Sequence, residues 1–292
     1  AKLSANDVSM FLRLIAALFV GVQGEPLSEP ELGKCIESAA QEKGYTLGEG
    51  AIVSTKCIQL YDLLQVRHSV FVIGPCGAGK SVILKLLARA MELHKGIRTI
   101  TETFDPKAIS SDELYGCINE QSREWKDGVM SKIFREFSTG SRYKKSNQWI
   151  VLDGDIDAEW IESMNSVMDD NKLLTLANGE RVTMTPQMRL VFEITHLHHA
   201  TPATVSRAGI LFVNDTDVGW APMKDRWIAS RKVDQQRSHL DILFDKHLVT
   251  FIQYTSANQR SMIPMSPIAY VENVCRLLEA VLDTDEFSGV PS

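Results

Sequence analysis

The sequence predicts an α/β protein with a five-stranded parallel sheet flanked by helices, followed by an α-helical domain. Five short apolar runs, separated mostly by helical patterns, predict the strands, at residues 69–73, 97–103, 148–153, 189–195 and 210–214. A glycine-rich motif stands directly after the first run and opens a helical pattern, which indicates a strand–turn–helix unit. After residue 214 only helical patterns follow, and they predict the second domain.

Composition and charge argue against several other classes of protein. Of the 292 residues, 44% are hydrophobic and 23% are charged, the profile of a soluble globular protein with an ample core. The net charge of −6 argues against nucleic acid as the main partner, and no basic patch with interleaved aromatics is present. The five cysteines are scattered without C-x-x-C spacing, which fits a reducing compartment.

Residues 1–68 are predicted to form a helical lead-in that packs on the core of the sheet. The most apolar stretch, residues 10–20, is too short to span a bilayer and carries Arg13. We expect a buried amphipathic helix there, capped by Asn6 or Asp7, and no membrane partner. The absence of an initiator Met and a helical pattern close to the last residue indicate a piece cut from a longer chain. Two further helices are predicted, at residues 30–40 and 58–66.

Two domains are predicted after the lead-in. Residues 69–215 should form the large α/β domain, and residues 216–292 an incomplete helical small domain. The pair Asn178-Gly179 predicts a β-hairpin between residues 173–177 and 180–183. The predicted helices lie at residues 82–91, 129–137, 157–168, 223–232, 240–254 and 268–282, the last with Ser266 as N-cap and Pro267 at its first position.

The glycine-rich motif has the pattern G-x-x-x-x-G-K-[ST], which is typical of a phosphate-binding loop. Its glycines let successive backbone N–H groups turn toward phosphate, and the following helix adds the positive end of its dipole. Lys80 should reach the β- and γ-phosphates, and the Ser81 hydroxyl should bind Mg²⁺. The chain is therefore expected to bind ATP (or ADP) with Mg²⁺. The nucleotide-binding residues are Gly74, Pro75, Cys76, Gly77, Ala78, Gly79, Lys80 and Ser81.

Asp153 ends the third predicted strand and is the expected second protein ligand of Mg²⁺. A P-loop hydrolase of this type needs a carboxylate at the next position to activate the attacking water, but that position is Gly154. Loss of a general base lowers the rate by about 10²–10⁴-fold. We therefore expect ATP to be hydrolysed slowly or not at all. The alternative is hydrolysis at this site with Asp155 as base, although Asp155 is also suited to cap the next helix.

Arg207 is a candidate functional residue outside the phosphate-binding loop and the third strand. Thr201 and Pro202 predict a short helix that ends at Arg207, just before the fifth strand. An arginine at the rim of the sheet, away from the chain's own phosphates, suits a trans-acting finger that neutralises charge on a neighbour's γ-phosphate.

The polar residues around the fourth strand are less decisive. His196, His198 and His199 lack carboxylate or thiolate company at ligand spacing, so we expect no metal site there. Glu193, Thr195 and His196 all compete for the place of the polar residue that senses the γ-phosphate. A carboxylate such as Glu193 would repel that phosphate unless the nucleotide is bound to Mg²⁺.

Six segments of the chain resemble the dynein heavy chain, and specifically the second AAA+ module of its motor ring. They are DPKA (105–108), REWKDG (123–128), WIVLDGDID (149–157), WIESMN (160–165), MDDNK (168–172) and ATPATVSRAG (200–209). The form of the last segment is more similar to axonemal than to cytoplasmic dyneins. The resemblance therefore implies an AAA+ P-loop NTPase fold, a place in the cytoskeleton of a ciliary or flagellar axoneme, and membership of a microtubule motor.

The same resemblance implies a role and a set of partners. The second module binds ATP without productive turnover, and its arginine finger, Arg207 here, completes the hydrolytic site of the first module. The two insertions lie in the long connections between the second and third and between the third and fourth predicted strands, and by resemblance they correspond to hairpins that act on the linker. Accessory chains and microtubules are partners only of the full-length protein. Two alternatives to this structural role are hydrolysis with Asp155 as base, and a small-molecule or nucleotide kinase. The long insertions and the helical tail argue against the kinase.

Overall fold

A computed structural model describes most of the chain. The described residues are 30–45, 47, 52–119, 121–140, 143, 145–231, 233–258 and 265–282, together with positions 10, 11, 13–15 and 18.

The centre of the fold is the predicted five-stranded parallel sheet. Its strand order is β2-β5-β8-β1-β9, so the first strand lies between the last two. The strands are β1 (Ser69–Ile73), β2 (Thr99–Phe104), β5 (Asn147–Asp153), β8 (Met188–Ile194) and β9 (Gly209–Phe212), each within a few residues of its prediction. Every residue of β1 is buried, which explains why its sequence is apolar without alternation.

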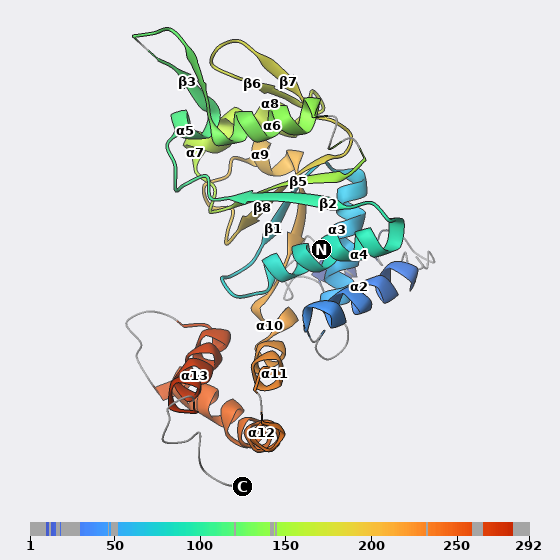
Figure 1. The fold of residues 1–292 in the computed structure, drawn as a ribbon, viewed down its shortest axis with the longest axis vertical. Helices are drawn as coiled ribbons and strands as arrows, with labels where there is room; N and C mark the ends of the chain where they lie inside the picture. Colours follow the sequence, from blue (N-terminus) through green and yellow to red (C-terminus); the bar gives the residue numbers. More distant parts are fainter. Residues whose placement is uncertain are drawn as a thin grey trace.

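Successive side chains of each strand point to opposite faces of the sheet, and two separate cores result. Val70 and Val72 of β1 pack with α2 (Pro30–Lys43), α3 (Ile52–Val66) and α4 (Lys80–Lys95) on one face. Phe71 and Ile73 pack on the other face, against a second layer of helices. Figure 1 shows the sheet between these two layers. The helices of the second layer are α5 (Ser111–Tyr115), α6 (Val129–Thr139), α7 (Ala158–Ile161), α8 (Asn165–Met168) and α9 (Pro202–Arg207).

Two β-hairpins project side by side beyond this second layer (Figure 1). The predicted hairpin pairs β6 (Leu173–Thr175) with β7 (Arg181–Thr183), and Gly179 takes a φ of +84° in its turn. The other pairs β3 (Gly116–Ile118) with β4 (Trp125–Asp127) and was predicted only from the resemblance. The long connections found in the sequence therefore fold as hairpins.

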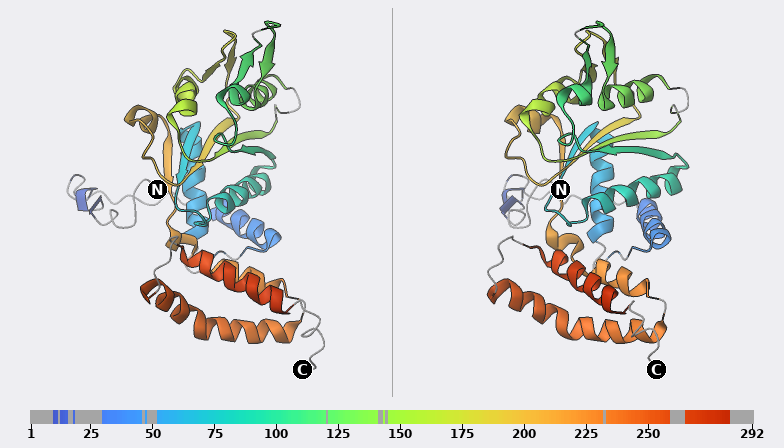
Figure 2. Two further views of the ribbon diagram at one scale, coloured as in Figure 1. Left: turned by 90° about the vertical axis from the view of Figure 1, so that its left-hand side faces the viewer. Right: turned by 60° about the vertical axis from the view of Figure 1, so that its left-hand side comes forward.

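The helical part forms its own layer at the opposite end of the molecule from the hairpins (Figure 2). The short helix α10 (Asp215–Val218) connects the sheet to α11 (Ala221–Ala229), α12 (Asp234–Asn258) and α13 (Pro267–Leu282). These three helices enclose a separate apolar core that includes Phe244 and Val271. The buried Lys224 joins α11 to α12, because its Nζ lies 2.9 Å from an oxygen of Asp241 and 3.0 Å from one of Asp245.

Two predictions for the helices differ from the structure. Positions 10, 11, 13–15 and 18 are helical as expected, but their apolar side chains are exposed, with Leu18 at 75% and Met10 at 67%. The prediction that this helix is buried is therefore wrong for the described residues, because nothing in this part of the chain covers its apolar side. The single helix predicted at 157–168 is interrupted by a 3₁₀ turn, η3 (Glu162–Met164). The predicted caps Asn6 and Asp7 lie outside the described residues.

The described part of the chain includes all five cysteines and the histidines His196, His198 and His199. None of its helices is long and apolar enough to cross a bilayer. It contains no group of three or more histidine, cysteine and acidic side chains placed to hold a metal ion, including at His196, His198 and His199. All five cysteines are free thiols.

Candidate nucleotide-binding site

The phosphate-binding loop joins the buried end of β1 to the start of α4, as the motif predicts. A Cβ atom on Gly74 would stand 2.1 Å from the carbonyl oxygen of Val213, so only glycine allows the loop to leave the sheet beside β9. Gly77 and Gly79 take φ values of +80° and +91°, in the left-handed region that other residues avoid. The glycines of the motif are thus required by backbone geometry.

The lysine and the serine of the motif begin the helix. Lys80 is the first residue of α4, and its Nζ donates hydrogen bonds to the carbonyl oxygens of Gly74 (2.6 Å) and Pro75 (3.1 Å). Its ammonium group therefore lies within the turn of the loop, where phosphate oxygens would be bound. Ser81 follows in the first turn and donates its hydroxyl proton to Oε2 of Glu193, at 2.6 Å.

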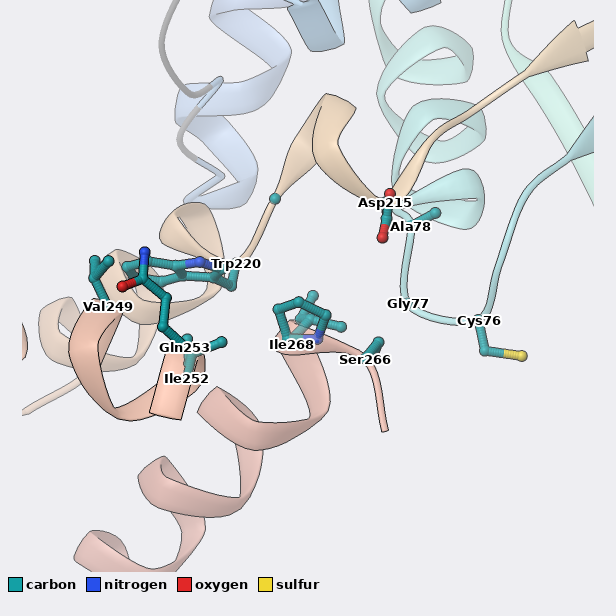
Figure 3. Close-up of a pocket in the computed structure, with 12 residues that line it drawn as sticks. Cys76, Gly77, Ala78, Asp215, Trp220, Val249, Ile252, Gln253, Ser266 and Ile268 are labelled. Atoms are coloured by element: carbon teal, nitrogen blue, oxygen red, sulfur yellow. The ribbon is translucent and has the colours of Figure 1, made fainter. Parts of the chain in front are cut away.

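A cavity of about 370 Å³ separates the loop from the helical domain (Figure 3). Trp220 and Ile268 line it from the helical side together with the amide of Gln253, opposite Gly77 and Asp215. Apolar walls with a few polar groups suit a purine base next to a phosphate loop. Sequence analysis did not identify this cavity, because it exists only where α12 and α13 meet the loop and no local motif marks it.

A second cavity lies along the other side of α4, between that helix and the sheet. Ser81, Asp153 and Glu193 line it. Asp153 of β5 and Glu193 of β8 are paired in register. Each of them stands two residues after a valine whose side chain packs in the core beneath α4. The three oxygen-bearing side chains therefore approach the same space. A serine hydroxyl and carboxylates are ligands that Mg²⁺ prefers, so the donor set fits this cation.

Glu193 is the buried carboxyl of the site. It is only 5% exposed, and burial raises its pKa above the ordinary value, with the negative charge of Asp153 acting in the same direction. The hydrogen bond from Ser81 and the charges of Lys80 and Lys85 only partly oppose this effect. A buried acid with a shifted pKa beside a phosphate-binding loop is a candidate functional residue.

The space beside Gly154 is already occupied by another side chain. A Cβ atom on Gly154 would stand 2.4 Å from Oδ1 of Asp105, and that oxygen accepts a hydrogen bond from the backbone N–H of Lys107 at 2.8 Å. Asp105 directly follows β2, next to β5, so the sheet brings the two residues together. Sequence analysis did not find this contact, since 49 positions separate the residues, as their numbers show.

Asp155, the alternative base, is bound to the neighbouring strand. Its Oδ1 accepts hydrogen bonds from both the backbone N–H (2.8 Å) and the hydroxyl (2.5 Å) of Thr195. Burial raises the pKa of Asp155, but these hydrogen bonds, together with the electrostatic effects of His196 and Lys107, outweigh it and the net shift of the pKa is downward. A carboxylate with a lowered pKa and an oxygen occupied in this way is a weak general base.

Arg207 ends α9, as predicted, and lines neither of the two cavities described above. Thr201 caps this helix by accepting a hydrogen bond from the backbone N–H of Thr204, and Pro202 occupies its first turn. The Nε atom of Arg207 donates to Asp169, and the arginine side chain is 28% exposed. An ion pair with Asp169 was not predicted.

The three sensor candidates have different surroundings. Glu193 contacts Ser81, whereas Thr195 contacts Asp155. The Nδ1 atom of His196 is buried without a hydrogen-bond partner, and its ring lies 4.7 Å from that of His198. Among the described side-chain hydrogen bonds of these three residues, that of Glu193 reaches the phosphate-binding loop.

The strand order, the phosphate-binding loop and the appended helical domain define a P-loop nucleotide-binding module of the AAA+ class. Residues 69–208 match the family model of the AAA domain of the dynein-related subfamily, and residues 1–81 match that of the hydrolytic ATP-binding site of the dynein motor region. The chain belongs to the dynein heavy chains, as a segment of their AAA region. This assignment argues against the kinase alternative.

The relatives are long motor chains of cilia and flagella. The chain is 44% identical over 281 residues to the ciliary dynein beta chain of Tripneustes gratilla and 42% identical over 285 residues to axonemal heavy chain 9 of Homo sapiens. It is 40% identical over 294 residues to the flagellar outer-arm beta chain of Chlamydomonas reinhardtii. These alignments cover 96–99% of this chain but only 6% of each relative.

Proposed function

We propose that this segment is the second AAA+ module of an axonemal dynein heavy chain, and that it binds Mg-ATP with little or no hydrolysis of its own. The observation that carries the proposal is Gly154, which has no side chain and whose free space is filled by the carboxylate of Asp105. A general base is therefore missing where the fold would place it. Ser81 and Asp153 would hold Mg²⁺, which supplies charge neutralisation at the phosphates.

The second part of the proposal concerns the neighbouring module. Arg207 lies outside the cavities of its own site, so its guanidinium is available to act in trans on a neighbour's γ-phosphate. In this role it would exchange Asp169 for phosphate oxygens, since both are anionic partners for the same group. Other modules, the linker near the hairpins, accessory chains and microtubules are the expected partners of the whole motor.

The alternative function, hydrolysis at this site with Asp155 as base, has less support. The Thr195 hydrogen bonds hold one oxygen of Asp155 at the end of β8 and lower its pKa. Both effects reduce its ability to take a proton from water.

The Arg207 role can be tested in the full-length heavy chain. Arg207→Ala is expected to lower microtubule-stimulated ATPase activity by about 10³-fold or more if it removes a finger, while nucleotide binding that depends on Lys80 stays unchanged. Arg276→Ala is a matched control, because that arginine pairs only within α13, with Glu272, in the described part of the chain. An unchanged ATPase rate in Arg207→Ala would remove Arg207 from this role.

A further inference from the structure

Glu193 has no place in the mechanism described so far, although it is the most deeply buried carboxylate of the site. It forms no ion pair in the described part of the chain, and its recorded side-chain partner there is the hydroxyl of Ser81. A buried acid is costly unless it has a partner of opposite charge. The fold nevertheless places it beside the phosphate-binding loop.

The contact with Ser81 has a defined direction. The hydroxyl proton of Ser81 points to Oε2 of Glu193, which turns the lone pairs of the hydroxyl oxygen away from that carboxylate. A metal ion bound by Ser81 needs those lone pairs and leaves the proton free to remain on the hydrogen bond to Glu193. The Glu193 carboxylate thus fixes the direction of the Ser81 hydroxyl, in the way that hydrogen-bond partners of metal ligands orient those ligands in other metal sites.

Charge gives Glu193 a second effect. Asp153 and Glu193 are neighbours on β5 and β8 and line one cavity with Ser81. A triphosphate beside these carboxylates is repelled when no cation lies between them, and a divalent cation converts this repulsion into attraction.

We propose that Glu193 is a positioning residue that orients the Ser81 hydroxyl toward Mg²⁺ and makes nucleotide binding at this site strictly dependent on that cation. The module would then retain Mg-nucleotide and release metal-free nucleotide. This inference rests on the proposed binding of Mg-ATP and adds a condition to it.

The test uses the full-length heavy chain and measures ATP retained after gel filtration, in Mg²⁺ and in EDTA. The pool that Lys80→Ala abolishes defines this site. In the wild-type chain this pool is expected to persist in Mg²⁺ and to be lost in EDTA. Glu193→Gln keeps a hydrogen-bond acceptor for Ser81 but removes the charge. The ratio of ATP retained in Mg²⁺ to ATP retained in EDTA should therefore fall by about tenfold or more.

Glu92→Gln provides a matched control. Glu92 lines the same cavity on α4 but pairs with Arg89, so its variant should keep the wild-type ratio. Because Glu193→Gln could also affect folding, binding of Mn²⁺ to the ATP-loaded chain is measured in parallel by electron paramagnetic resonance. The variant is expected to bind Mn²⁺ more weakly than the Glu92→Gln chain.

Three results would overturn a part of the account. An unchanged ratio in Glu193→Gln, with unchanged Mn²⁺ affinity, rejects the role of Glu193 and leaves Mg-ATP binding intact. Equal loss of nucleotide in Mg²⁺ and in EDTA reduces Glu193 to a purely structural residue and also rejects the inference. Absence of any pool dependent on Lys80 would reject the proposed function itself.

Discussion

At the scale of single residues, the candidate site combines polar groups that suit phosphate and Mg²⁺ with one position, Gly154, that has no side chain. In the proposed function, Lys80, Ser81 and Asp153 would bind phosphate and Mg²⁺, whereas Gly154 offers no base. The identities of these residues could be read from the sequence, because local motifs encode them. The contacts of Asp105, Glu193 and Asp169 could not, since each depends on strands or helices that meet only in the folded chain.

The contact between Gly154 and Asp105 leads to a prediction about restoring catalysis. Gly154→Glu alone is expected to leave hydrolysis at this site nearly unchanged, because the new side chain would meet the Asp105 carboxylate and add like charge beside it. The double variant Gly154→Glu with Asp105→Ala should raise turnover by about 10²-fold, the lower range for a general base. The measurement is single-turnover ATP hydrolysis that depends on Lys80, with Asp105→Ala as control. A full gain in the single variant would show that Asp105 does not obstruct this position.

At the scale of elements, the two hairpins share one anchor. Arg135 of α6 donates to Asp127 of β4 (2.5 Å) and, through two nitrogens, to Glu180 beside β7 (2.9 and 3.1 Å). The sequence predicted one hairpin from its Asn178-Gly179 turn, and the resemblance predicted the other. Their connection through Arg135 could not be predicted, because it joins three segments that no local pattern relates.

Replacing this anchor should loosen both hairpins together. Arg135→Met keeps the apolar stem but removes the guanidinium, so hydrogen exchange in β3, β4, β6 and β7 should become faster while exchange in the sheet stays the same. Lys132→Met, on the exposed side of α6, is the control. Exchange that accelerates in only one hairpin would contradict a shared anchor.

The same anchor gives a pH dependence of known sign. Hydrogen bonds from Arg135 lower the pKa of both Asp127 and Glu180 in the folded chain. Their stabilising contribution is therefore complete above the ordinary pKa values of these carboxyls and is lost as the pH falls through the lowered values. The difference in hairpin hydrogen-exchange rates between the wild-type chain and Arg135→Met should therefore disappear once the pH falls below the lowered pKa values.

At the scale of the whole molecule, the sheet with its loop and the helical domain form the two sides of the cavity beside the phosphate-binding loop. The sequence predicted the five strands, the loop and the helical domain, because apolar runs and turn residues mark each of them. It did not predict the strand order or the participation of Trp220 and Gln253, which follow from how distant segments pack. It also placed residues 10–20 in the core, whereas their described side chains are exposed. Periodicity alone does not reveal which surface covers an apolar helix.

Whether this module holds ATP without hydrolysing it can be tested in the full-length heavy chain by following the fate of bound ATP. The chain is loaded with ATP labelled at the γ-phosphate and then chased with unlabelled ATP while the other sites hydrolyse. A pool of label is expected to remain as bound ATP through the chase and to be absent from Lys80→Ala. Release of that pool as labelled phosphate, abolished by Asp155→Asn, would contradict the account and establish hydrolysis at this site.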